Sequence, residues 1–159
     1  MSAFGASAAF MVPVALVFTL PNSLGEELGW RAFALPRLQQ CHGPLVASVM
    51  LGLFWGFWHT PMWVAWRSGE QSWWPILLMV VNMVPVAIVF TWLFNATKGS
   101  LLLVCVYHAS MAAKGYLFPK LPTITEVVIL WLLAFLVIVR GGFLRGRGHR
   151  FPPGSREEP

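Results

Sequence analysis

Long apolar runs with very few charged residues alternate with short polar segments along most of the chain. The runs occupy residues 4–20, 45–66, 74–94, 101–118 and 124–139. Each is near the length of about 20 residues that a helix needs to cross the apolar core of a bilayer. The segments between them contain proline, glycine or polar residues and lie at 20–23, 41–44, 67–72, 95–100 and 118–123. The pattern predicts membrane-spanning helices joined by short loops.

Residues 23–40 are expected to form a further helix between the first two runs. The sequence then predicts about six helices in one all-α, polytopic transmembrane bundle. Lipid leaves closed β-barrels as the only other spanning architecture, and the runs show no sustained alternation of apolar and polar residues. A barrel is therefore not expected.

The overall composition supports a membrane protein. Of all residues, 57% are hydrophobic and only 11% are charged, and the mean hydropathy is +0.67. A soluble domain usually carries about a quarter charged residues.

The C-terminal end differs from the rest of the chain. Residues 142–159 are rich in glycine, proline and arginine, so we expect a basic, disordered tail after a membrane-embedded core at 1–141. Placing this tail in the cytoplasm puts most loop lysines and arginines on that side, as the positive-inside rule requires. The net charge of +5 is then explained by topology and by attraction to anionic membrane lipid. Nucleic-acid binding is not expected, because these residues form no folded basic patch.

The segment LGEELGWRAF, residues 24–33, places two glutamates and an arginine in an otherwise nearly uncharged region. Glu27 and Arg31 are four residues apart with the acid first, the favourable order for a helical ion pair. Glu26 has no adjacent partner, and an unpaired carboxylate in an apolar layer is a functional candidate. The alternative is that this helix begins at the interface and both glutamates are solvated at its N-terminus.

Two histidines, His59 and His108, lie inside apolar runs. A lone histidine there could simply bond a backbone carbonyl group. Each, however, shares a helical face with small residues, which let helices approach closely, so both are expected to point into the bundle. These small residues are Ser48, Gly52 and Gly56 for His59, and Ala112 and Gly115 for His108.

Glu26, His59 and His108 are predicted at similar depths, within roughly 5 to 15 Å of the outer side if the helices alternate. One shared pocket is therefore feasible. A carboxylate and two imidazoles in an apolar pocket suit hydrolysis, since the carboxylate can act as a base and imidazole can hold water, donate to an oxyanion or bind a metal. From the residues alone, an intramembrane hydrolase and a proton-coupled carrier both remain open. A carrier would need a continuous polar path, which the runs do not supply.

Three motifs in these segments resemble those of the CPBP family, which comprises type II CAAX prenyl proteases and bacterial relatives linked to bacteriocin processing and immunity. EELGWR fits the motif EExxxR, WGFWH at 55–59 fits aromatic-xxx-H, and HASMA, which begins at His108, fits most of HxxxN. The resemblance covers residue 23 to about residue 140. Three motifs in the expected order, each on its own apolar segment, make the resemblance specific.

The resemblance implies an intramembrane endopeptidase acting on a membrane-associated peptide or protein, in a multi-pass protein of a bacterial plasma membrane. Glu26 and His59 would activate water, His108 would stabilise the oxyanion, and Glu27 and Arg31 would support the site. Family members are described both as zinc metalloproteases and as metal-free glutamate proteases. In a zinc site, Glu26, His59 and His108 would supply three protein ligands for Zn²⁺.

Two departures from the family pattern bear on activity. The asparagine expected four residues after His108 is Ala112, which leaves the oxyanion hole one donor short unless Asn82 packs nearby and replaces it. The chain also begins one helix before the first motif, whereas relatives usually have more. A catalytically weak or inactive homologue that acts by binding partners is therefore the alternative to a working peptidase.

Overall fold

The computed structural model describes residues 3–66, 73–117, 123–141 and 143, and their side chains over 13–65, 73–113, 124–141 and 143. The described elements are all helical, which confirms the predicted all-α bundle. They are α1 (Ala3–Glu27), the π-helix η1 (Leu28–Ala34), α2 (Leu35–Cys41), α3 (Pro44–Trp66), α4 (Trp74–Ala96), α5 (Leu101–Leu117) and α6 (Thr123–Arg140).

The first two predicted helices form one continuous helical segment, so the described part of the chain has about five long helical segments rather than six. The loop expected at residues 20–23 is wrong, since α1 passes through Pro13 and Pro21 and leads directly into η1 and α2. Two hydroxyl side chains near Pro21 bond back to backbone carbonyl groups of the preceding turn. The hydroxyl of Thr19 donates to the carbonyl oxygen of Ala15 at 2.9 Å, and that of Ser23 donates to Thr19 at 2.9 Å.

The other helix ends agree with the sequence pattern to within one or two residues. The turn between α4 and α5 contains Lys98 at φ 56° and Gly99 at φ 88°. This left-handed backbone is easily adopted by glycine and ends α4 at the expected polar stretch.

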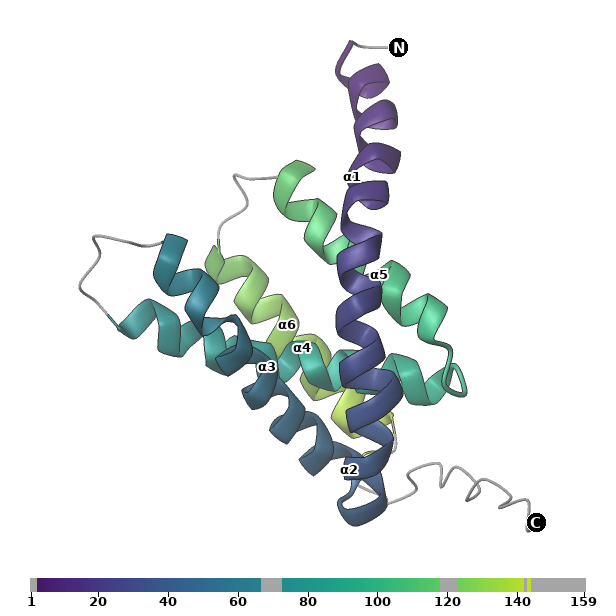
Figure 1. Cartoon of the computed structure of the whole chain (residues 1–159), viewed down its shortest axis with the longest axis vertical. Coiled ribbons are helices and arrows are strands. Elements are labelled where there is room, and N and C mark those ends of the chain that lie inside the picture. Colours follow the sequence, from purple (N-terminus) through teal and green to yellow (C-terminus); the bar gives the residue numbers. More distant parts are fainter. Residues whose placement is uncertain (1–2, 67–72, 118–122, 142, 144–159) are drawn as a thin grey trace.

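Helix α4 lies at the centre of the bundle. It packs extensively along α3 and also against α6, while α1 packs mainly on α5 and crosses it (Figure 1). Gly52 and Gly56 permit the close approach of α3 to α4, because a Cβ atom there would lie 2.6 Å from Val84 Cα and 2.7 Å from Val80 Cα respectively. The predicted small-residue face of α3 is thus an interhelical contact.

One apolar cluster joins four helical segments. Its buried members come from α2, α3, α4 and α5 and are Leu35, Ala47, Leu51, Trp55, Val86, Phe90, Phe94 and Val104. The π-helix leads into this cluster through Leu35. The cluster therefore holds the segment that carries the glutamates against the helices that carry the histidines.

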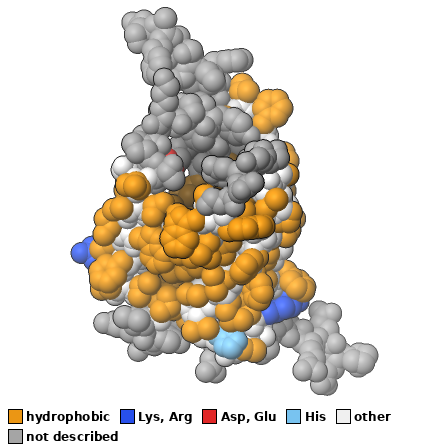
Figure 2. Space-filling model, turned by 90° about the vertical axis from the view of Figure 1, so that its left-hand side faces the viewer, with side chains coloured by type: hydrophobic (Ala, Val, Ile, Leu, Met, Phe, Trp, Pro, Cys, Tyr) orange, Lys and Arg blue, Asp and Glu red, His pale blue; other side chains and the backbone are white. Residues whose placement is uncertain are grey.

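The outer surface is also largely apolar. Figure 2 shows hydrophobic side chains over most of the described part of one face, with the visible basic side chains near its edges. By length and composition alone, two described helices could cross a membrane, Pro44–Ala65 and Trp74–Ala96, and α5 adds a shorter apolar stretch at Leu101–Ala113. Lipid is the solvent that such a surface fits.

The folded core extends further than the predicted boundary at residue 141. Phe143 is buried and packs with Val84, Ile88 and Ala134. The side chain of Phe143 therefore holds this part of the chain, which follows the end of α6, against both α4 and α6. Residues 142 and 144–159, the rest of the predicted tail, lie outside the described residues.

Candidate active site

The two glutamates lie where α1 meets η1, in the middle of a continuous helical segment. The alternative of a helix N-terminus solvated at the interface is therefore wrong. Glu27 is 0% exposed, while Glu26 is half-buried. The π-helix that follows has wider hydrogen-bonded turns than an α-helix, a feature frequent at functional sites.

Glu27 is the centre of a buried charged group. Its Oε1 atom accepts a hydrogen bond from Arg31 Nη1 at 3.1 Å, which confirms the expected ion pair. The same oxygen lies 2.7 Å from His108 Nδ1. Arg31 is 1% exposed, and its guanidinium lies between the rings of Trp55 and Phe90, 4.5 Å from each centroid. The arginine is thus neutralised by one neighbour and enclosed by two aromatic rings.

Several atoms of this group have no hydrogen-bond partner among the described residues. They are Glu27 Oε2 and Arg31 Nε and Nη2. Buried polar atoms are normally paired. This site therefore keeps one hydrogen-bond acceptor and two donor nitrogens that no described side chain uses.

Glu26 is held by two donors. Asn22 Nδ2 donates to its Oε1 at 2.9 Å, and the indole Nε1 of Trp55 donates to its Oε2 at 2.7 Å. Both donors stabilise the negative charge and fix the direction of the carboxylate. Each carboxylate oxygen keeps a further lone pair that can accept from water.

A groove of about 420 Å³ opens beside Glu26. Besides Glu26, it is lined by Pro21, Asn22, Gly25, Gly29, Trp30 and Trp58. Neither histidine is among these lining residues. Of the three predicted catalytic side chains, Glu26 is the one that borders this open space.

His59 lies half-buried beside the groove wall. Its Nδ1 is 2.9 Å from the backbone oxygen of Trp55. The His59 ring packs edge-on against Trp58 with a centroid distance of 5.0 Å. Trp58 and Glu26 both line the groove. His59 therefore contacts a residue of the groove wall without lining the groove itself.

Trp55 connects all of these groups, a role that was not predicted from the sequence. Its indole N–H binds Glu26, its backbone oxygen binds His59, and its ring contacts those of His59 and His108 at centroid distances of 5.9 and 5.3 Å. The available signal was its place as the first residue of the aromatic-xxx-H motif. Asn22 and Phe90 were also missed, and no motif in this chain marks them.

Ala112 lies on a different face of α5 from the one expected, and Asn82 does not take the place of the missing asparagine. Ala112 is exposed, and α5 instead presents Ala109 and Ala113 as its buried small residues. The backbone oxygen of Ala109 accepts a hydrogen bond from Thr19 at 3.2 Å, which joins α5 to α1. Asn82 accepts from Trp131 Nε1 on α6 at 3.1 Å. Asn82 is therefore engaged with α6 and does not replace the asparagine beside His108.

The predicted zinc ligands are not grouped as a metal site. Among the described residues, no three histidine, cysteine, aspartate or glutamate side chains are placed to hold one ion. Glu26 and His59 make separate contacts with Trp55, while His108 binds Glu27. This donor set does not fit a three-ligand catalytic zinc site, and the zinc alternative stays a prediction.

Comparison with known proteins identifies the family. The chain is 30% identical over 135 residues to CAAX prenyl protease 2 of Methanococcus maripaludis. The match covers 80% of this chain and 49% of the relative, so the chain spans about half the length of that protein. Residues 8–114, which contain all three motifs through Ala112, match the model of the type II CAAX prenyl endopeptidase Rce1-like family. The match covers most of the chain, and the chain therefore belongs to the Rce1-like family of type II CAAX prenyl endopeptidases.

Proposed function

We propose that the protein is an intramembrane endopeptidase that hydrolyses a peptide bond in a membrane-associated peptide or protein, with water activated by Glu26 and His59. The observation that carries this proposal is the meeting of all three motifs around Trp55. Membership of a family of CAAX endopeptidases supports the same reaction class. The CAAX substrate named for the relative becomes a candidate substrate here.

Glu26 serves as the general base in this proposal. It borders the groove of about 420 Å³, so water and substrate can reach its carboxylate. The hydrogen bonds from Asn22 and Trp55 hold the carboxylate in one orientation. An oriented base within hydrogen-bond reach of water is the arrangement that general base catalysis requires.

His59 assists by binding the same water. The backbone oxygen of Trp55 can only accept, so the Nδ1 atom of His59 must carry the hydrogen in their 2.9 Å contact. In the neutral ring, Nε2 then presents a lone pair. That lone pair can accept from the attacking water and align it with Glu26.

His108 stabilises the oxyanion. Its Nδ1 donates to the ionised Glu27 at 2.7 Å, so Nε2 can donate to an oxyanion only when the ring carries both hydrogens. The contact with Glu27 also fixes the orientation of the ring, as a carboxylate does for other catalytic histidines.

The proposed reaction balances without another reactant. Glu26 takes a proton from water while the water oxygen bonds to the carbonyl carbon, and His108 donates a hydrogen bond to the resulting oxyanion. When the intermediate collapses, the carbon–nitrogen bond breaks and Glu26 passes its proton to the leaving amine. We propose no step through a metal, because Glu26, His59 and His108 are not arranged as three ligands.

A binding role without catalysis is the second candidate function. The observation that favours it is Ala112, which supplies a methyl group where the family motif has an amide. Each oxyanion donor is worth roughly 10² to 10³ in turnover. A homologue lacking one could retain its fold and act by binding a partner in the membrane.

We further propose a multi-pass topology in a bacterial plasma membrane with the C-terminus in the cytoplasm. Among the described basic residues, Arg37 lies in α2, near the end of the first helical segment, Arg140 ends α6, and Lys98 lies in the turn between α4 and α5. If the five helical segments cross the membrane in alternating directions, these three positions lie on the same side of it. Their charge favours the cytoplasmic face.

Replacing Glu26 by glutamine tests whether Glu26 is the general base. Glutamine has nearly the same size but cannot take a proton from water. We expect Glu26→Gln to lower cleavage of a prenylated CAAX peptide by about 10² to 10⁴-fold, the usual worth of a general base. The measurement is peptide cleavage by purified protein in lipid nanodiscs. Glu126→Gln, the same change on α6, is the matched control and should leave the rate unchanged. Cleavage that persists in Glu26→Gln would overturn the mechanism.

Replacing Trp55 by phenylalanine tests whether its N–H group positions Glu26. The new ring keeps an aromatic surface for Arg31 and His108 but loses the bond to the carboxylate. A hydrogen bond to a charged group is worth enough to lower kcat by roughly 10-fold or more, and we expect KM to change little. Trp74→Phe, at an exposed tryptophan, is the control for this substitution. An unchanged kcat in Trp55→Phe would show that Glu26 does not need this donor.

Restoring the motif asparagine separates the two candidate functions. Ala112→Asn places an amide one helical turn from His108, and a working peptidase should gain up to roughly 10² to 10³ in turnover. The exposed position of Ala112 gives the larger side chain room. Ser110→Asn, exposed on another face of α5, is the control. If no variant cleaves while partner binding survives in Glu26→Gln, the binding function is correct.

Removing Arg31 should destabilise the protein as well as the site. Arg31→Ala leaves Glu27 buried without its ion pair, which costs about 3 to 5 kcal/mol in comparable buried pairs. Thermal unfolding in detergent measures the loss, and Arg37→Ala, at an exposed arginine, is the control. The double variant Arg31→Ala, Glu27→Gln should recover part of the stability because it removes the isolated charge. A variant Arg31→Ala that is fully stable and lacks only activity would instead place Arg31 in substrate binding.

A further inference from the structure

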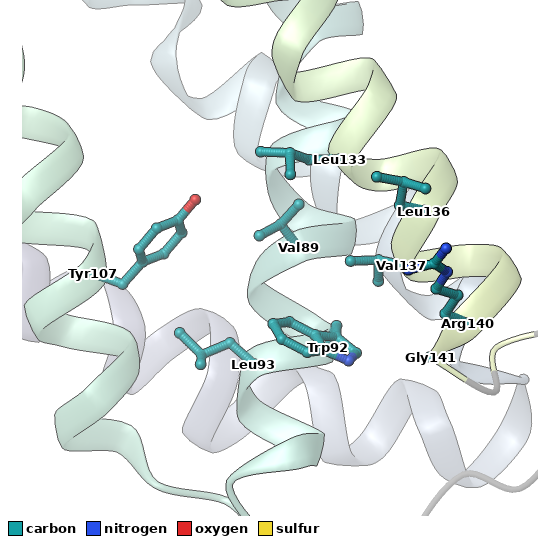
Figure 3. Close-up of a pocket in the computed structure, with 9 residues that line it drawn as sticks. All are labelled: Val89, Trp92, Leu93, Tyr107, Leu133, Leu136, Val137, Arg140 and Gly141. Atoms are coloured by element: carbon teal, nitrogen blue, oxygen red, sulfur yellow. The ribbon is translucent and has the colours of Figure 1, made fainter.

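A second groove lies between α4, α5 and α6, and it shares no lining residue with the groove beside Glu26. Its volume is about 560 Å³, within the range of about 300 to 1,000 Å³ typical of sites for small ligands. The lining residues, shown in Figure 3, are Val89, Trp92, Leu93, Tyr107, Leu133, Leu136, Val137, Arg140 and Gly141.

The groove follows from how the helices pair. Helix α5 packs mainly on α1, and α6 packs on α4, while α5 and α6 have little contact with each other. The side chains of α4 between them, such as Val89 and Leu93, therefore form the floor of an open apolar channel. Figure 3 shows Tyr107 extending from α5 toward these side chains on one side, with the α6 residues on the other.

The groove is apolar except near the end of α6. Arg140 occupies the last turn of that helix, is exposed, and has no ion pair or hydrogen bond to another described residue. Trp92 lies against the next residue, since a Cβ on Gly141 would be 2.8 Å from Trp92 Cδ1. Tryptophan and arginine are the residues that anchor helices at headgroup level.

We propose that this groove binds one anionic phospholipid, with an acyl chain along the apolar channel and the phosphate at Arg140. Its lining residues lie toward the C-terminal ends of α4 and α6, the side that our proposed topology places in the cytoplasm. The cytoplasmic leaflet carries the anionic lipids, and basic pockets between membrane helices on that side bind their headgroups. A free phosphate would gain nothing from the apolar channel. A zwitterionic lipid would gain less from Arg140 than an anionic one, because its own cationic group offsets the charge of its phosphate.

The test is native mass spectrometry of the purified full chain in neutral detergent. The probes are dioleoyl phosphatidylglycerol and dioleoyl phosphatidylcholine, which share acyl chains and differ in headgroup charge. We expect one phosphatidylglycerol to bind with about fivefold higher affinity than phosphatidylcholine, as one basic residue near the headgroup supplies. This measurement needs no catalytic activity, so its outcome is independent of the proposed peptidase function.

Two matched pairs of variants locate the lipid. Arg140→Gln should abolish the preference for phosphatidylglycerol, while Arg37→Gln, at an exposed arginine on α2, should preserve it. Leu136→Trp should fill the channel and weaken binding of both lipids, whereas Leu132→Trp, exposed on α6 outside the groove, should not. Thermal unfolding confirms that each variant is folded.

Other outcomes overturn the proposal. Equal binding of the two lipids, or a preference that survives Arg140→Gln, would show that the groove does not recognise an anionic headgroup. Displacement of phosphatidylglycerol by an uncharged farnesylated peptide, unaffected by Arg140→Gln, would identify the groove as a site for the lipid group of a substrate.

Discussion

The structure depends on the buried charge of Glu27 and on how it is neutralised. Glu27 is fully enclosed, and a carboxylate in an apolar layer is stable only with partners. One of its oxygens is shared by Arg31 from η1 and His108 from α5. Because Arg31 is in turn enclosed by Trp55 of α3 and Phe90 of α4, satisfying this one charge fixes four helical segments relative to each other. The same contacts place the neighbouring Glu26 at the edge of the enclosed region, beside a groove.

The two glutamates therefore have different tasks although they are adjacent in sequence. Glu27 faces inward and organises the site, whereas Glu26 is half-buried and keeps access to the groove. Neighbouring residues on a helix point about 100° apart, so one helix can present one carboxylate to the core and another to an opening. Trp55 links the two regions through its ring and its N–H group.

Sequence patterns predicted the helical class, the extents of the four helices after residue 43, the Glu27–Arg31 pair and the family. They did not predict that α1 continues through Pro21, because a proline followed by polar residues usually marks a loop and the packing of α1 on α5 cannot be read from hydropathy. The contact of His108 with Glu27 depends on packing between residues 81 positions apart, and the role of Trp55 depends on the direction of one indole. The placement of Phe143 was missed because glycines and arginines surround it in the sequence. Local periodicity specifies the helices, but the contacts between them arise from tertiary packing.

The spacing of Glu27 and Arg31 also affects the order in which the protein can assemble in the membrane. Both charges belong to one continuous helical segment, so they can neutralise each other as soon as that segment forms. The pair can then enter apolar surroundings before any later helix is in place, because a paired charge is far less costly there than an isolated one. His108 follows 81 residues after Glu27 and joins a pair that is already in place. Pairing of the two charges within the first segment and completion of the polar centre by His108 are therefore separable steps of folding.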